Sequence, residues 1–210
     1  MKKKIHRKHI IMVFIASNYA QYQYDYQGNR SRKVVYKNNI REERYYVGNF
    51  EIYRRYVNNS LDYQRTSNNV SDDTKVFARV DVKNGNETLI RYQYDNHLGS
   101  ACLELDNNAQ IISYEEYHPF GTSSYRAGRD ITEVSLKRYK YCGKERDEET
   151  GLYYYGMRYY AAWICRFVSV DPLQHEYPEL TPYQCTPLKF LSNVSTAIFN
   201  GIIKYGNPKP

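Results

Sequence analysis

Three carboxylates follow one another at Asp147-Glu148-Glu149, and two close carboxylates can supply the acid and the base of glycoside hydrolysis. The alternative is a solvated hairpin end, because Gly151 follows directly and glycine accepts the positive φ of a tight turn. We expect the hairpin end rather than a hydrolytic pair.

Histidine and cysteine do not show the spacing of a metal site. His97, His118 and His175 are too far apart to be paired on one helical face. No C-x-x-C pair occurs, so a zinc site is not expected and isolated buried thiols are. We expect no metal and no other cofactor. The four cysteines are Cys102, Cys142, Cys165 and Cys185.

Arginine precedes paired tyrosines at Arg44-Tyr45-Tyr46 and again at Arg158-Tyr159-Tyr160. Such groups can form a stacking platform for single-stranded nucleic acid, or cross-strand cation–π pairs inside a sheet. The formal net charge is +7, but residues 1–20 contain five of the basic residues and no acidic one. The remainder is nearly neutral, which favours the sheet and argues against a nucleic-acid partner.

The sequence predicts that β-strands position these residues. Tyr accounts for 25 of 210 residues and favours strands, and residues 1–171 contain one proline, Pro119. Gly with Asn or Asp between alternating runs predicts hairpin turns near Asp25–Asn29 and at Gly48-Asn49. The composition predicts an all-β fold. Further strands are expected at 75–82, 89–95, 101–105, 110–117 and 152–160, and none in the polar stretch 58–74.

The two ends of the chain differ from this body. Residues 10–16 are apolar after a basic stretch, which fits either a weak signal peptide or a ragged first strand. No apolar run reaches the length of a membrane span. Six of the seven prolines follow Asp171, so an extended tail is expected. Residues 188–203 have helical spacing, as either a membrane-active or partner helix or a tail helix covering a sheet edge.

A short unit occurs twice, as Tyr22-Gln23-Tyr24-Asp25 and as Tyr92-Gln93-Tyr94-Asp95. The two tyrosines of each copy lie on one face of a strand, and the following Asp can accept hydrogen bonds from its own turn. A Gly follows each copy, at Gly28 and Gly99. A single hairpin cannot bury its aromatic face alone, so an array of such units is expected.

This unit resembles the YD repeat, and residues 92–172 resemble the RHS repeat-associated core of the Rhs (rearrangement hotspot) family. The resemblance rests on several short motifs in the family's order. The matching residues are Tyr22, Tyr24, Asp25, Gly28, Tyr92, Tyr94, Asp95, His97, Leu98, Gly99, Ser100, Pro119, Phe120, Gly121, Glu149, Gly151, Leu152, Tyr153, Tyr154, Arg158, Tyr159, Tyr160, Arg166, Phe167 and Pro172.

The resemblance implies part of a curved β-shell that encloses a C-terminal effector in bacterial toxin delivery, in a secreted or surface-associated protein. The implied partners are other shell segments and a toxin domain, and open sheet edges would favour self-association. The expected division is a leader at 1–20, repeat hairpins at 21–91, the core at 92–183 and a divergent tail at 184–210. A Tyr-rich carbohydrate- or nucleic-acid-binding module remains an alternative.

Asp171 lies where the resemblance places one carboxylate of an aspartyl self-cleavage site. Such a site needs two close carboxylates, and no Asp follows Asp171 in this chain. We therefore expect a non-catalytic fragment in which Asp171-Pro172 starts a turn. Self-processing through Asp171 and an unrecognised carboxylate is the alternative.

Overall fold

Two antiparallel sheets make up the computed structural model, which describes residues 10–15, 18–72, 76–129, 137–176 and 181–184. Eleven strands form the large sheet in sequence order, β1 to β11, and four short strands form the small sheet, β12 to β15. The expectation of an all-β fold is confirmed. No helix among the described residues is long and apolar enough to cross a membrane.

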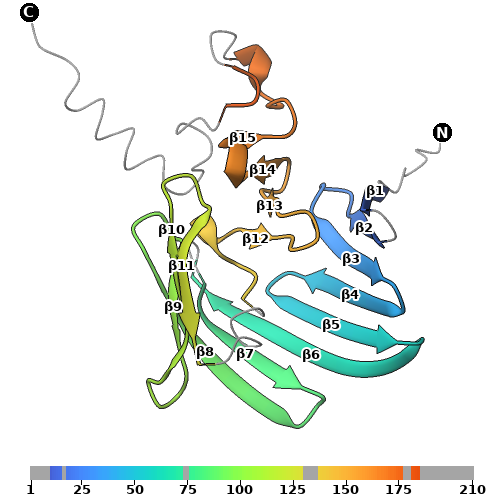
Figure 1. The fold of residues 1–210 in the computed structure, drawn as a ribbon, viewed down its shortest axis with the longest axis vertical. Helices are drawn as coiled ribbons and strands as arrows, with labels where there is room; N and C mark the ends of the chain where they lie inside the picture. Colours follow the sequence, from blue (N-terminus) through green and yellow to red (C-terminus); the bar gives the residue numbers. More distant parts are fainter. Residues whose placement is uncertain (1–9, 16–17, 73–75, 130–136, 177–180, 185–210) are drawn as a thin grey trace, which may run out of the picture.

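Each strand of the large sheet pairs with the next one in the chain, so every connection is a hairpin. The strands are β1 (Ile10–Ile15), β2 (Asn18–Tyr24), β3 (Arg30–Lys37), β4 (Ile40–Val47), β5 (Phe50–Val57), β6 (Ser60–Ser71), β7 (Val76–Lys83), β8 (Glu87–Asp95), β9 (Ala101–Leu105), β10 (Ile111–Tyr117) and β11 (Ser123–Gly128). The sheet bends, so that β2–β3 and β9–β11 rise on opposite sides of it (Figure 1).

The hairpins near the middle of the sheet are closed by two-residue turns. Asn38, Gly48 and Asn58 begin the turns after β3, β4 and β5, with φ of 54°, 58° and 49°. Positive φ is what the common two-residue hairpin turn needs, because its twist then matches that of the strands. The turn expected at Gly48-Asn49 is therefore present.

A second, five-residue turn recurs after β2, β8, β9 and β10. In the first, the Asp25 amide donates to the Asn29 carbonyl (2.8 Å), and the Asp25 carboxylate accepts from the Gln27 and Asn29 amides. The residue three places after the first has positive φ in every case. The four turns begin at Asp25, Asn96, Asp106 and His118.

The two copies of the Tyr-Gln-Tyr-Asp unit face opposite sides of the sheet. Tyr22 is 1% exposed on the concave face, whereas Tyr94 is 55% exposed. The second turn begins at Asn96, one residue later than in the first copy, and Asp95 ends β8 instead. Because side chains alternate along a strand, this shift of one residue reverses the face. The expected turn role of Asp95 is wrong, and Asn96 has it.

The small sheet lies between the two raised sides of the large one (Figure 1). Its strands and the 3-10 turns around them are short, so buried aromatic side chains hold this part together. Tyr141, Tyr153, Tyr160 and Phe167 form its core. The elements are η1 (Tyr141–Gly143), β12 (Glu145–Arg146), β13 (Tyr153–Tyr154), β14 (Tyr159–Ala161), η2 (Ala162–Ile164), β15 (Arg166–Phe167) and η3 (Gln174–Glu176).

Two strands of the large sheet were not expected from the sequence, and one expected strand is divided. β6 runs through the polar stretch that predicted no strand, because its buried side chains include Arg65 and Ser67 and so lack apolar alternation. β11 was also missed. The strand expected at 152–160 is split into β13 and β14 by a turn. The helix expected at 188–203 lies outside the described residues.

Candidate functional site: a charged interface inside the curved sheet

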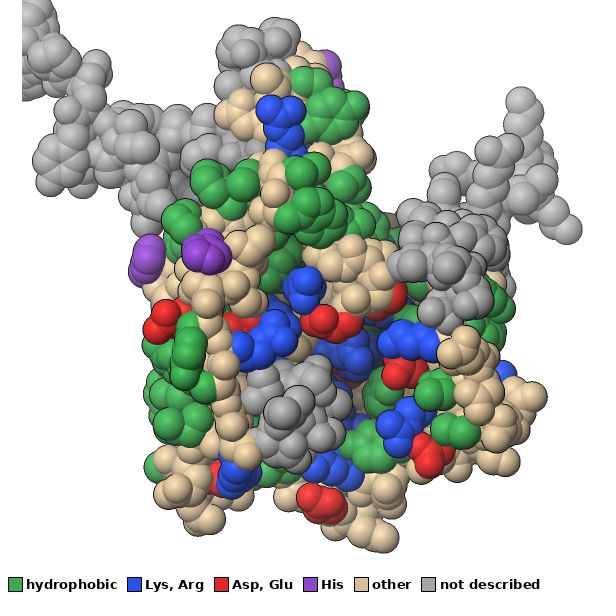
Figure 2. Space-filling view, in the orientation of Figure 1, with side chains coloured by type: hydrophobic (Ala, Val, Ile, Leu, Met, Phe, Trp, Pro, Cys, Tyr) green, Lys and Arg blue, Asp and Glu red, His purple; other side chains and the backbone are tan. Residues whose placement is uncertain are grey.

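Charged side chains form rows across the concave face of the large sheet. Lys33, Arg44, Tyr53 and Arg65 are direct cross-strand neighbours on β3 to β6. Side chains directly opposite one another on neighbouring strands share a face, so this is a row of cations around one tyrosine ring. Figure 2 shows Lys, Arg, Asp and Glu side chains gathered over the middle of this face.

An acidic row runs beside the cationic one. Glu51, Ser67 and Asp81 are cross-strand neighbours on β5, β6 and β7. The next positions on the same face are cationic again, where Arg79 lies opposite Arg91. Asp81 accepts from Ser67 (2.5 Å), Arg79 (3.0 Å) and Arg91 (3.0 Å), so the acidic row is paired within the sheet.

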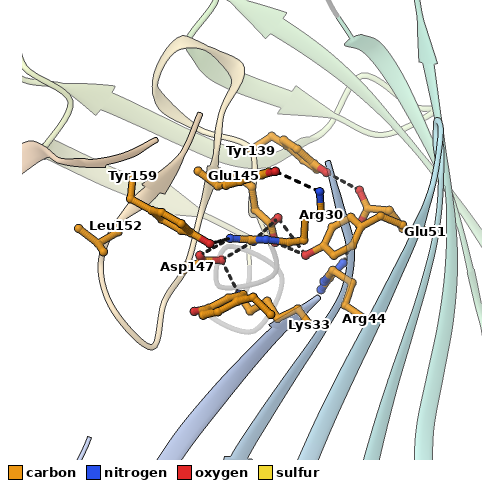
Figure 3. Close-up of polar contacts among 12 residues, drawn as sticks. Arg30, Lys33, Arg44, Glu51, Tyr139, Glu145, Asp147, Leu152 and Tyr159 are labelled. Carbon is orange, nitrogen blue, oxygen red and sulfur yellow. Dashed lines mark hydrogen bonds and ion pairs between the residues drawn. The ribbon is translucent and has the colours of Figure 1, made fainter. Parts of the chain in front are cut away.

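Residues 137–167, which we call the crossing segment, cover this face and carry their own carboxylates into it. Asp147 is fully buried and forms a two-pronged ion pair with Arg30, with nitrogen–oxygen distances of 2.8 and 2.7 Å. Lys33 Nζ lies 2.6 Å from the same carboxylate. Figure 3 shows the hairpin that holds Asp147 pointing at these two cations.

The carboxylates on either side of Asp147 bind the same strands. Glu145 accepts from Arg30 (3.0 Å) and from the Tyr46 hydroxyl (2.9 Å). Glu149 accepts from the Tyr22 hydroxyl (2.7 Å) and pairs with Lys33 (2.8 Å). Every second residue of this stretch thus meets a cation or a phenol of β2 to β4.

The beginning of the crossing segment contacts the middle and the far side of the sheet. Tyr139 donates to Glu51 on β5 (2.6 Å). Lys137 and Lys140 lie 3.7 and 3.9 Å from the carboxylate of Glu115 on β10, and Lys137 also donates to the carbonyl of Ala101 on β9. The crossing segment therefore joins strands from both sides of the curve.

Three tyrosine hydroxyls of the crossing segment bind the turn after β10. Tyr141, Tyr160 and Tyr153 donate to three consecutive carbonyls, at 2.7, 3.0 and 2.9 Å. These are the carbonyls of Pro119, Phe120 and Gly121 in that order. A buried carbonyl without a donor is costly, so the hydroxyls explain why this core uses tyrosine where phenylalanine would pack as well.

Electrostatics keep the buried carboxylates charged. Burial alone would raise the pKa of Glu51, but Arg79 and Arg44 lower it to about 2. The pKa of Asp147 is likewise lowered against burial, by Lys33 and Arg30. Burial, followed by Asp147 and Glu149, raises the pKa of the Tyr22 hydroxyl, which therefore stays a donor.

The hairpin end expected at Asp147-Glu148-Glu149 is present and Glu148 is exposed there, but the expectation of a solvated end is wrong for Asp147. Asp147 is buried, and its carbonyl accepts from the Gly151 amide (2.6 Å) within a turn. Sequence reasoning missed this interface because the matching cations are more than 100 residues away. The carboxylates are engaged in ion pairs, an arrangement that positions chain segments.

The Arg-Tyr-Tyr groups lie in the sheets, where they make aromatic and cation–π contacts. Arg44 lies 5.0 Å from the ring centroid of Tyr53, and Arg158 lies 3.6 Å from that of Phe167. Tyr159 accepts from Arg30 (2.9 Å) and shares a 2.5 Å hydrogen bond with the Tyr24 hydroxyl. These contacts favour the sheet interpretation over a stacking platform.

Asp171 lies apart from the charged interface, after β15. Its carboxylate pairs with Arg158 (3.0 Å) and accepts from the Leu173 amide (2.9 Å). The carbonyl of Asp171 accepts from Gln174, where η3 begins. This is the geometry of a turn-initiating residue before Pro172.

Several other matching residues hold the small sheet against the large one. Ser100 is buried and its hydroxyl accepts from the Cys142 amide (3.0 Å), while Leu98 packs on the aromatic core. Tyr154 donates to the carbonyl of Gly28 (3.3 Å).

Two further matching residues do not join the sheets. Arg166 forms an isolated bridge with Gln184. His97 is exposed in the turn after β8.

Comparison with curated proteins finds toxin subunits and tRNA nucleases over parts of the chain, although no family model matches it. Toxin subunit YenC1 of Yersinia entomophaga is 53% identical over 83 residues, which are 40% of this chain and 8% of the relative. The tRNA3(Ser)-specific nuclease WapA of Bacillus spizizenii is 29% identical over 154 residues, 73% of this chain and 6% of the relative. The chain thus spans less than a tenth of either protein.

Solved structures share the fold over most of the chain. The crystal structure of TcdB2-TccC3 matches with a TM-score of 0.74 at 36% identity, covering 80% of this chain and 8% of that one. The Photorhabdus luminescens Tc holotoxin pore matches with a TM-score of 0.74 at 35% identity and the same coverage. The β-sheet fold of this chain is thus similar to part of these toxin structures. These matches support the resemblance to the Rhs/YD-repeat family that the motifs of the chain indicate.

Proposed function

We propose that this chain is a non-catalytic structural segment of an Rhs/YD-repeat toxin shell, which encloses or delivers a C-terminal effector. The partners would be further strands of the same shell and the effector itself. The family relation supports a location outside the producing cell, either secreted or on its surface. The proposed division at residue 91/92 falls within β8, so repeats and core would share one sheet.

The crossing segment carries this proposal. Through buried ion pairs and tyrosine hydrogen bonds, it connects strands β2–β5 on one side of the sheet with strands β9 and β10 on the other. The crossing segment would therefore act as a brace that holds the sheet in its curved form. Such a brace has a mechanical use, because a sheet that encloses a cargo must keep its curvature while its edges accept neighbouring strands.

A chimera tests the proposal. The segment of TcdB2-TccC3 that aligns with this chain is replaced by this chain's residues, and the hypervariable C-terminal region of that protein is tested for protease resistance. We expect the region to stay as resistant as in the parent. A matched chimera with Asp147→Asn, which breaks the brace, should lose the resistance. A folded chimera whose C-terminal region is digested would contradict a shell role.

A further inference from the structure

Three guanidinium groups converge on the ring of Tyr53 under the crossing segment. Arg44 lies 5.0 Å from the ring centroid, and Arg65 and Arg138 each lie 5.9 Å from it. They come from β4, from β6 and from the beginning of the crossing segment. The cluster of three guanidinium groups is therefore complete only when the crossing segment covers the sheet.

These guanidinium groups are buried and are not saturated with hydrogen bonds. Arg65 is 1% exposed, and neither its Nε nor one of its terminal nitrogens has a hydrogen-bond partner in the described part of the protein. The same holds there for one terminal nitrogen of Arg44 and for Nε of Arg138. Buried donors of this kind are rare and costly, and they commonly mark a bound water or ion.

The nearest carboxylate is already engaged by other donors. Asp81 accepts from Ser67, Arg79 and Arg91, and its closest oxygen remains 4.0 Å from Arg65 Nε, beyond hydrogen-bonding distance. Burial, followed by the neighbouring Arg79, lowers the pKa of Arg65 to about 10.

Glu51, the other carboxylate of the acidic row, is likewise occupied. It pairs with Arg44 (2.7 Å), accepts from Tyr139 (2.6 Å) and lies 3.6 Å from Arg79. Arg44, Arg65 and Arg79 therefore share two carboxylates, and Arg138 adds a further cation beside them.

We propose that a small inorganic anion binds between Arg65, Arg44 and Arg138, on the concave face under the crossing segment. Charge-assisted hydrogen bonds from guanidinium groups suit such an anion, and the burial of these groups excludes a macromolecule. The anion would link β4 and β6 to the crossing segment, and so would strengthen the same brace as the ion pairs of Asp147.

Thermal unfolding of the full chain tests the site, with chloride replacing gluconate at constant ionic strength. Binding to the folded state alone predicts a melting temperature that rises with chloride and then saturates. In Arg65→Met and Arg138→Met, half-saturation should move to at least about tenfold higher chloride, since a charged contact is lost. The control is Arg55→Met, which removes an exposed ion pair with Asp62 and should keep the parent's half-saturation.

Two outcomes would overturn the proposal. One is a chloride response that does not saturate, or that is the same in all three variants, since either is a general salt effect. The other comes from crystals of the parent protein soaked in bromide. Anomalous scattering should show one bromide within hydrogen-bonding distance of Arg65, and its absence there would exclude the site even if a variant failed to fold.

Discussion

Arg30 and Asp147 form a two-pronged ion pair across 117 residues of sequence, with both side chains buried. The pair ties the start of β3 to the tip of the crossing segment. A buried charge that loses its partner costs more than the pair contributes, because the remaining ion is left desolvated. The pair is therefore a sensitive place to test the brace.

Asp147→Asn should destabilise the protein strongly, because two buried cations, Arg30 and Lys33, would lose a shared carboxylate and would each keep one charged partner, Glu145 and Glu149. We expect a loss of about 3–5 kcal/mol in the free energy of unfolding, measured by urea denaturation. Asp62→Asn is the control, since the Asp62–Arg55 pair is exposed and should contribute about 0–1 kcal/mol. Similar losses in both variants would show that the buried pair has no special weight.

Tyr153→Phe tests the hydroxyls that bind the turn after β10. The ring would stay packed, but the carbonyl of Gly121 would lose its donor. We expect a loss of about 1–3 kcal/mol in unfolding free energy. Tyr94→Phe, at an exposed position, should change the value by less than about 0.5 kcal/mol. An equal effect at both positions would argue against the hydrogen bond.

A comparison of Gly121→Ala with Gly48→Ala separates the steric cost of a close contact from the cost of backbone strain. A Cβ at Gly121 would lie 2.5 to 3.0 Å from ring atoms of Tyr141, whereas at Gly48 it would meet nothing within 4 Å. Both positions have positive φ, so Gly48→Ala measures strain alone, about 1 kcal/mol or more. We expect Gly121→Ala to cost a further 1–3 kcal/mol, roughly, from overpacking. Equal unfolding free energies for the two variants would mean that the Tyr141 ring moves aside at no cost.

Acid should weaken the interface in a defined range of pH. The pKa of Glu51 is about 2 in the folded protein against 4.5 for a free side chain, so its contribution is complete above about pH 4.5 and is lost as the pH falls to about 2. In Glu51→Gln the unfolding free energy should fall less steeply over this range, by up to about 1.4 kcal/mol per pH unit. Glu87→Gln, at an exposed site, should keep the parent's slope.

Self-processing through Asp171 would leave a mark on the mass of the purified chain. We expect a single intact species that Asp171→Asn does not change, because the carboxylate is paired with Arg158 and bound into a turn. A discrete shorter species that disappears in the variant would instead support the self-cleavage alternative.

Local signals in the sequence were sufficient for part of the fold. The turns at Asp25–Asn29 and Gly48-Asn49 were predicted because turn chemistry and the flanking alternation lie within a few residues. The strand β6 was missed because its buried face is polar, carrying Arg65 and Ser67. Hydrophobic alternation cannot reveal a strand whose buried face is charged.

The charged interface could not be predicted in the same way. Asp147 was read as solvent-exposed because its partners, Arg30 and Lys33, are distant in sequence and have no local signature. The resemblance to a known family pointed to this stretch as a motif, but only the fold brings the carboxylate under the sheet. The partners of a buried ion pair are set by tertiary structure.

The four five-residue turns determine which face of the sheet each side chain of the preceding strand occupies. Removal of one residue between Tyr94 and Asn96 would turn Tyr92 and Tyr94 inward and Arg91 outward, with no other change in composition. Whether a repeated tyrosine pair faces the interior or the outside is thus encoded in the spacing to the turn, so length changes of one residue are expected to be far more disruptive in this sheet than substitutions of the tyrosines themselves.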